Sequence, residues 1–189
     1  RAFREPPKEI QWDFTLKALK KPARVEVEGV SPQEFFRRYV PFDFNGKVGI
    51  INYPSEGFVE EKLYAHEASL KMVGGASQSS LHLKYDDIVD VVITSLKNGS
   101  PVYFSCDVGE KLDKKRETLD LRNYDFSLLF PKAPEMTKKE RIETGESNST
   151  HSMTLVGVHL VDKKPVRWCV LNSWGGKTGK DGRITMTHE

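Results

Sequence analysis

The stretch VRWCVLNSWGG, residues 166–176, is the part of the sequence that decides the fold prediction. It begins as an apolar run typical of a β-strand and ends at Asn172, which Ser173, Trp174 and two glycines follow at once. A carboxamide at a strand end can orient a partner side chain, and a nearby indole can keep water away from that contact. The pattern therefore predicts a polar site here, with a partner from another segment.

Two further strand-like runs lie on either side of this stretch. THSMTLVGVHL, residues 150–160, precedes it, and RITMT, residues 183–187, follows it. The sequence DKKP at 162–165 predicts a turn between the first two strands, and a glycine-rich loop over 175–182 leads to the last one. The end of the chain is thus predicted to form an antiparallel sheet.

The predicted hairpin brings His151 close to Asn172. In an antiparallel pair the start of one strand lies beside the end of the other, so these residues become neighbours although 21 positions separate them. A carboxamide oxygen can hold an imidazole in one tautomer and one orientation, as a general base requires. We predict that this pair is catalytic and that Trp174 shields it. Ser152 and Ser173 are predicted to be further residues of the cleft.

The rest of the chain combines helix signals with short strand-like runs. Helices are predicted over residues 31–40, 86–98 and 137–142, and strands over 47–53 and 101–106. The first and third helices begin with capping boxes, in which Ser or Thr precedes Glu by three positions. Helices early in the chain and antiparallel strands at its end indicate an α+β fold.

Composition and motifs argue against several classes of protein. The 189 residues include 29 basic and 27 acidic side chains, a net charge of +2, which is no general signature of nucleic-acid binding. The loop GGKTGKDG fails as a phosphate-binding loop because Leu171 stands where that motif needs glycine. No apolar stretch is long enough to span a bilayer, so no membrane association is predicted.

The cysteines and the remaining histidines do not form a metal-binding pattern. Cys106 and Cys169 are too few for a disulfide scaffold or a four-thiolate site, and both are predicted to be buried free thiols. This usage favours a reducing, intracellular setting. The other histidines lack metal-ligand spacing, and no metal or cofactor is predicted; they are His66, His82, His159 and His188.

Residues 150–189 resemble the closing part of the papain-like cysteine peptidases, in their bleomycin hydrolase or aminopeptidase C branch. PVYFSCDVGEKLD (101–113), YDFSLLF (124–130) and GESNSTHSM (145–153) resemble the same branch. The resemblance implies that residues 31–189 form the C-terminal, β-rich half of a papain-like domain, a barrel or sheet with flanking helices. Residues 1–30, charged and containing several prolines, are then interpreted as a connecting segment from an upstream region.

The resemblance also implies roles for individual residues. His151 and Asn172 match the histidine and asparagine of the family's Cys–His–Asn set, and Trp174 matches the indole that covers them. No Gln…Cys-Trp pattern occurs in this sequence, so the nucleophilic cysteine is expected upstream, outside the chain. Cys169 stands three positions before Asn172 on one strand and should point away from it. Cys106 ends a strand without a helix start to activate it, so neither thiol is expected to be the nucleophile.

By resemblance, the whole protein would be a cytoplasmic thiol protease and a homohexamer, acting as an aminopeptidase on peptide or amide substrates without a cofactor. The chain-end arm that limits such enzymes to amino-terminal trimming is not found before Glu189, so the aminopeptidase prediction follows from the resemblance only. The alternative is a catalytically inactive peptidase-like module used for binding or assembly. Nucleic-acid binding through surface lysines is a third and weaker hypothesis.

Overall fold

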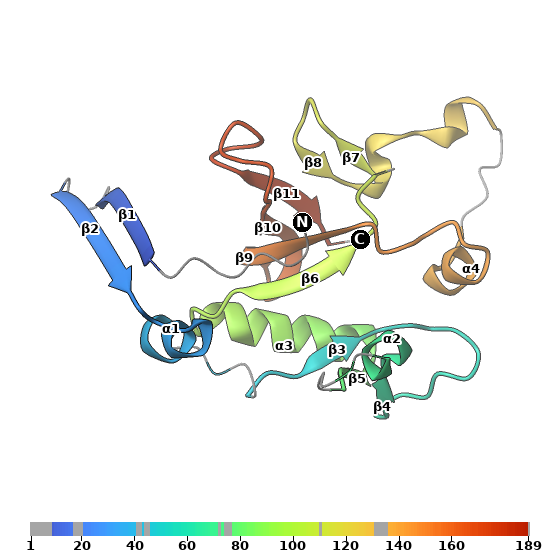
Figure 1. Ribbon diagram of the computed structural model, residues 1–189. Coiled ribbons are helices and arrows are strands. Elements are labelled where there is room, and N and C mark those ends of the chain that lie inside the picture. The colour runs from blue at the N-terminus through green and yellow to red at the C-terminus, as the bar shows by residue number, and fades with distance from the viewer. Residues whose placement is uncertain are drawn as a thin grey trace. The chain divides into compact units, whose positions relative to one another are not determined.

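The computed structural model describes residues 9–16, 21–40, 43, 46–71, 73, 77–109, 111–130 and 136–188. They belong to two compact units, Arg1–Lys47 and Val48–Glu189 (Figure 1). The second unit contains the sheet predicted from the end of the sequence.

The described part of the first unit contains a hairpin and a helix. Strands β1 (Glu9–Leu16) and β2 (Lys21–Glu28) pair antiparallel. Helix α1 (Pro32–Tyr39) begins with the predicted capping box, in which Ser31 Oγ accepts from the Glu34 N–H at 3.3 Å. This hairpin was not predicted from the sequence, in which residues 1–30 were interpreted as a connecting segment. A proline at position 22, opposite residue 15 in the pairing, weakens the strand signal because it cannot donate a backbone hydrogen bond.

The second unit is organised around a six-stranded sheet of order β6-β9-β10-β11-β8-β7. All neighbouring pairs are antiparallel except β11 and β8, which are parallel. The strands are β6 (Val102–Cys106), β7 (Leu112–Asp113), β8 (Thr118–Leu119), β9 (His151–Val161), β10 (Lys164–Leu171) and β11 (Arg183–Thr187). The strands predicted at 101–106 and at the end of the chain are confirmed.

The hairpin of β9 and β10 determines where the site residues lie. Asp162 and Lys163 form its turn, and both have positive φ values, of 49° and 66°. Two left-handed residues give a turn whose twist matches that of the strands it joins. The register pairs Val161 with Lys164 and Thr154 with Leu171, so the start of β9 lies beside the end of β10.

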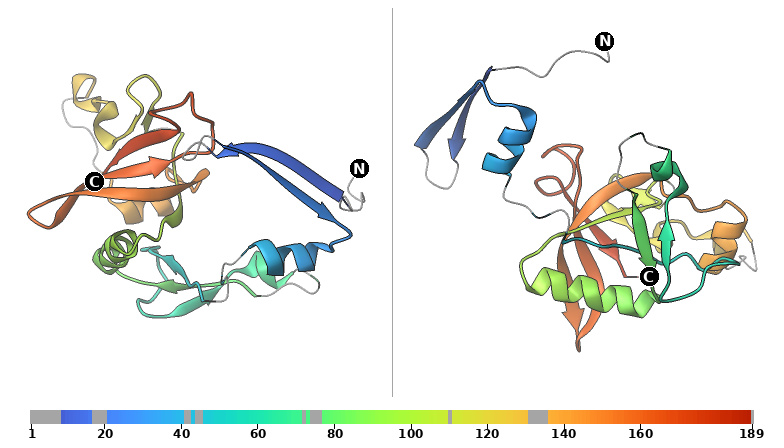
Figure 2. Two further views of the ribbon diagram at one scale, coloured as in Figure 1. Left: turned by 90° about the vertical axis from the view of Figure 1, so that its left-hand side faces the viewer. Right: turned by 60° about the horizontal axis from the view of Figure 1, so that its bottom comes forward.

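Helices and a smaller sheet complete the second unit (Figure 2). Strands β3 (Gly49–Ile51), β5 (Ser79–His82) and β4 (Leu63–Ala65) form a sheet in the order β3-β5-β4. The helices are α2 (Glu67–Leu70), α3 (Tyr85–Lys97), α4 (Lys138–Glu143) and the 3-10 turns η1 (Leu121–Asn123) and η2 (Phe126–Leu128). The helix predictions near 86–98 and 137–142 are confirmed.

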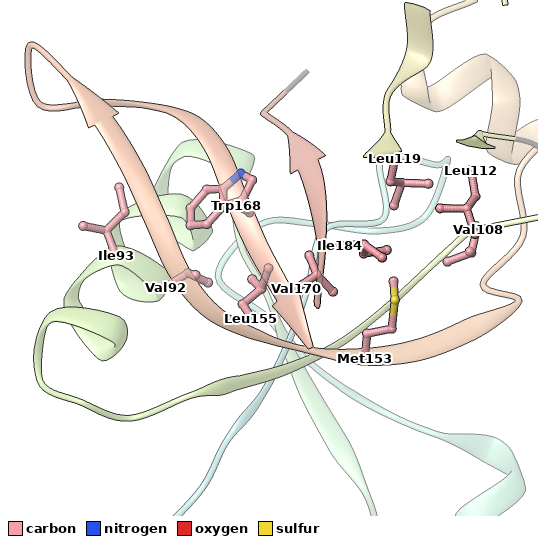
Figure 3. Close-up of a cluster of buried hydrophobic side chains, with 10 residues drawn as sticks. All are labelled: Val92, Ile93, Val108, Leu112, Leu119, Met153, Leu155, Trp168, Val170 and Ile184. Carbon is pink, nitrogen blue, oxygen red and sulfur yellow. The ribbon is translucent and has the colours of Figure 1, made fainter. Parts of the chain in front are cut away.

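The hydrophobic core anchors β9 and β10. Val92 and Ile93 of α3 belong to the same buried cluster as Leu155 of β9 and Trp168 and Val170 of β10 (Figure 3). Val170 is fully buried. Burying an aliphatic side chain of this size contributes about 1.5–3 kcal/mol, so the strands that carry the candidate site are held firmly.

Candidate active site

His151 and Asn172 are in contact where β9 begins and β10 ends, in the interior of the sheet order. His151 is the first residue of β9, and Asn172 directly follows β10. The imidazole Nε2 lies 2.9 Å from the Asn172 Oδ1 atom. The predicted proximity of these two side chains is therefore confirmed, whereas their catalytic role stays a prediction.

The hydrogen bonds of Asn172 determine the tautomer of the imidazole. The Ser173 backbone N–H donates to Asn172 Oδ1 at 2.7 Å, and because a backbone N–H can only donate, this atom must be the amide oxygen. The same oxygen faces His151 Nε2, so Nε2 must carry a proton and donate it. The neutral imidazole then has an unprotonated Nδ1, which is free to accept a proton from another group.

Asn172 is held by burial and by its own backbone. Its exposed fraction is 7%, and its backbone N–H donates to the Gly182 carbonyl at 2.8 Å. Gly182 has a φ of +81°, which a side-chain-bearing residue adopts only with strain. A buried amide strengthens the hydrogen bond that it accepts because little water competes for its oxygen. Among the described residues, the Asn172 Nδ2 has no hydrogen-bond acceptor.

Trp174 covers the imidazole. The two rings stack with their centroids 5.0 Å apart and their planes inclined by 28°. Trp174 is 45% exposed, so part of the indole covers the imidazole and part remains open to solvent. This is the position expected of a side chain that shields the contact between His151 and Asn172.

The two predicted serines differ in their placement. Ser173 contributes its backbone N–H to the site, as described above. Ser152 follows His151 on β9, and successive side chains of a strand point to opposite faces. Its hydroxyl bonds instead to that of Ser105 on β6, its partner in the register. The structure therefore does not bring Ser152 together with the imidazole.

Thr150, directly before His151, is fixed by three hydrogen bonds to the last residue of β6 and the two residues that follow it. Its N–H donates to the Cys106 carbonyl at 3.1 Å, and its Oγ1 accepts from the Val108 N–H at 3.1 Å. The same hydroxyl donates to Asp107 Oδ1 at 3.3 Å. This arrangement was not predicted from the sequence, because nothing in the residue spacing shows that β6 pairs with β9.

The two cysteines lie on different strands. Cys106 is the register partner of His151, and burial, reinforced by the Asp107 carboxylate, raises the pKa of its thiol to about 11. The thiol is therefore protonated at neutral pH, which is unsuitable for a nucleophile. Cys169 lies on β10, and both residues are free thiols.

The part of the chain that the structure describes contains neither a metal-ligand cluster nor a helix able to span a membrane. No group of three or more His, Cys, Asp or Glu side chains there could hold a metal ion. None of the helices described there is both long and apolar enough to cross a membrane.

The fold is that of a papain-like peptidase: an α+β arrangement with a half-barrel sheet and a few packed helices. The chain belongs to the peptidase C1-like family, whose sequence profile matches residues 1–189. The family and the fold class predicted from the sequence are thus confirmed.

Named relatives support the assignment. The chain is 34% identical over 160 residues to aminopeptidase C of Lactobacillus delbrueckii subsp. lactis, covering 85% of this chain and 36% of the relative. It is 33% identical over 190 residues to human bleomycin hydrolase, covering 97% and 41%. The crystal structure of pepW from Lactobacillus rhamnosis superimposes with a TM-score of 0.85 at 36% identity, covering 97% and 41%. The chain thus spans about two fifths of the length of the relatives that it matches.

Proposed function

We propose that this chain supplies the histidine and asparagine of a cysteine-peptidase active site, and that the whole protein is an aminopeptidase of the bleomycin hydrolase type. The observation that carries the proposal is the 2.9 Å contact between His151 Nε2 and Asn172 Oδ1, in an orientation that leaves Nδ1 free. Membership of the peptidase C1-like family and the names of the relatives support it.

The reaction begins with proton transfer to His151. Its Nδ1 accepts the proton of a cysteine thiol from a segment outside this chain, which gives a thiolate and an imidazolium. The thiolate attacks the carbonyl carbon of the substrate, and the imidazolium then donates its proton to the departing amine. In the second half, the imidazole takes a proton from water, whose oxygen attacks the thioester and releases the acid and the thiol.

Asn172 and Trp174 assist this proton transfer without reacting. The amide oxygen accepts the Nε2–H bond in both protonation states of the ring, which keeps Nδ1 directed at the thiol. The indole limits the access of water to this hydrogen bond. Because the amide is fixed before the substrate binds, little reorganisation is needed during the reaction.

The proposed substrates are peptides and amides with a free amino terminus, in keeping with the relatives named aminopeptidase C. The proposed location is the cytoplasm, supported by two free thiols, which persist in reducing compartments. The proposed assembly is a homohexamer, which rests on the resemblance to the bleomycin hydrolase branch. Size determination of the whole protein in solution tests the assembly.

The alternative is an inactive peptidase-like module, and one experiment distinguishes it from an active enzyme. The full-length protein is assayed on an aminoacyl amide under reducing conditions, together with the variant His151→Ala. Turnover that is lost in this variant supports the proposal. The matched control is His159→Ala, an exposed histidine further along β9, which should keep full activity. Turnover that survives His151→Ala contradicts the mechanism, and no turnover by the unmodified protein favours the module.

A further inference from the structure

Two loops, one of which contains Trp174, line a groove. They are the turn between β7 and β8, residues 114–117, and the loop between β10 and β11, residues 172–182 (Figures 1 and 2). The Gly179 N–H donates to Glu117 Oε1 at 2.7 Å, which ties the loops together. The groove between them has a volume of about 360 Å³, and Trp174 forms part of its wall.

The groove carries a surplus of positive charge. Lys114 from the first loop and Lys177 from the second line it, and both are exposed. Neither lysine forms an ion pair or a side-chain hydrogen bond with the part of the chain that the structure describes. Glu117, which also lines the groove, already accepts the Gly179 N–H through Oε1. Among the described residues, the groove is thus lined by two lysines without partners, one from each loop, and by one carboxylate that already accepts a hydrogen bond. This surplus of positive charge favours an anionic ligand.

Trp174 connects this groove to the proposed catalytic pair. The indole stacks on the His151 ring and also lines the groove. In the mechanism above, the imidazolium gives its proton to the departing amine, so the part of the substrate beyond the scissile bond must lie next to His151. The indole thus borders both the His151 ring and the groove that Lys114 and Lys177 line.

We propose that the groove is a leaving-group subsite that selects a carboxylate through Lys114 and Lys177. This inference rests on the proposed peptidase function and adds a substrate class to it. The carboxylate can come from an Asp or Glu side chain directly after the scissile bond, or from the carboxy terminus of a dipeptide. Both present the same chemistry to the two ammonium groups.

Four substrates with the same amino-terminal residue separate these sources. Leu-Glu-amide is compared with Leu-Gln-amide, and Leu-Ala with Leu-Ala-amide, by the kcat/KM of the full-length protein. An exposed ion pair changes a binding equilibrium by a factor of about 1.4 to 5, so two lysines together should give a preference of roughly twofold to 25-fold for a carboxylate. A preference in the first pair identifies the side chain, and one in the second pair identifies the terminus.

Substitution of the two lysines tests whether they cause the preference for a carboxylate substrate. The double variant Lys114→Gln/Lys177→Gln should bring the kcat/KM ratio of the preferred pair close to one. The matched control is Lys115→Gln/Lys180→Gln, which changes the same two loops at exposed positions that do not line the groove. This control should keep the preference. Raising the ionic strength should reduce the preference of the unmodified protein, because salt screens exposed charges.

The outcomes distinguish this inference from the proposed function. Activity of the unmodified protein with ratios of one in both substrate pairs overturns the subsite and leaves the peptidase proposal standing. A preference that persists in Lys114→Gln/Lys177→Gln, or disappears equally in the control, also overturns it. Activity that is insensitive to His151→Ala, or absent on all four substrates, contradicts the proposed function and the subsite together.

Discussion

Cys106 lies directly opposite His151 in the register of β6 and β9. Side chains of directly opposed residues share one face of a sheet, so a thiol stands beside the proposed general base. Proximity alone does not activate it. Burial and the Asp107 carboxylate both disfavour the thiolate and raise the pKa of Cys106 to about 11. A protonated thiol is a poor nucleophile, which separates this cysteine from the activated thiol that the mechanism requires.

The variant Cys106→Ala should therefore keep the peptidase activity of the full-length protein. In the unmodified protein, alkylation of Cys106 should be slow at pH 7 and should accelerate about tenfold per pH unit until the pH nears the thiol pKa of about 11, because only the thiolate reacts. Mass spectrometry of the peptide that contains residue 106 measures this rate. Loss of activity in Cys106→Ala, with rapid alkylation at pH 7, would identify this cysteine as the nucleophile instead.

Local signals were enough to predict most of the second unit. Alternating apolar residues, the turn at 162–165 and the capping box at Thr137 each act over a few residues, and the structure contains the strands and the helix that they indicate. The contact between His151 and Asn172 followed from the hairpin, because one turn fixes the register of both strands. Such features need no information about distant parts of the chain.

Features that depend on distant segments were missed. The bonds from Thr150 to the segment after Cys106 require β6 to pair with β9, across more than 40 positions of sequence. The parallel pairing of β8 with β11 and the groove beside Trp174 likewise join separate parts of the chain. Ser152 was placed in the cleft by its position next to His151, although the alternation of a strand directs adjacent side chains to opposite faces.

Removing the amide of Asn172 should lower kcat more than it raises KM. Asn172→Ala deletes the acceptor of the His151 Nε2–H and of the Ser173 N–H. An unsatisfied buried donor costs about 1–3 kcal/mol, which corresponds to a loss of roughly 5- to 150-fold in rate. Asn172→Asp keeps an oxygen that can accept both bonds and should retain more activity. Steady-state kinetics of the two variants test this order, and equal losses would argue against an orienting role.

Replacing Trp174 should lower kcat by a factor set by the free energy of its stacking on His151. An aromatic pair contributes about 0.5–1.5 kcal/mol beyond its buried area, so Trp174→Ala should lower kcat by roughly 2- to 13-fold. Trp174→Phe keeps a flat ring that can stack on the imidazole and should recover part of this loss. Since Trp174 is 45% exposed, the thermal unfolding temperature should change little in both variants. A kcat unaffected by Trp174→Ala would exclude a shielding role.

Thr150 should act as a positioning residue for His151. Its hydroxyl accepts from the Val108 N–H and donates to Asp107, which fixes the backbone immediately before the imidazole. Thr150→Val has nearly the same shape but leaves the Val108 N–H without an acceptor, at a cost of about 1–3 kcal/mol. We expect this variant to lower kcat at nearly constant KM, because a displaced imidazole slows proton transfer while substrate contacts remain. Thr150→Ser restores the hydroxyl and should recover most of the activity.

The discriminating measurement is kcat for Thr150→Val and Thr150→Ser at equal folded fraction, determined by circular dichroism. If Thr150→Ser were as impaired as Thr150→Val, the threonine would act through its methyl group and packing, and the hydroxyl would have no part in holding the imidazole.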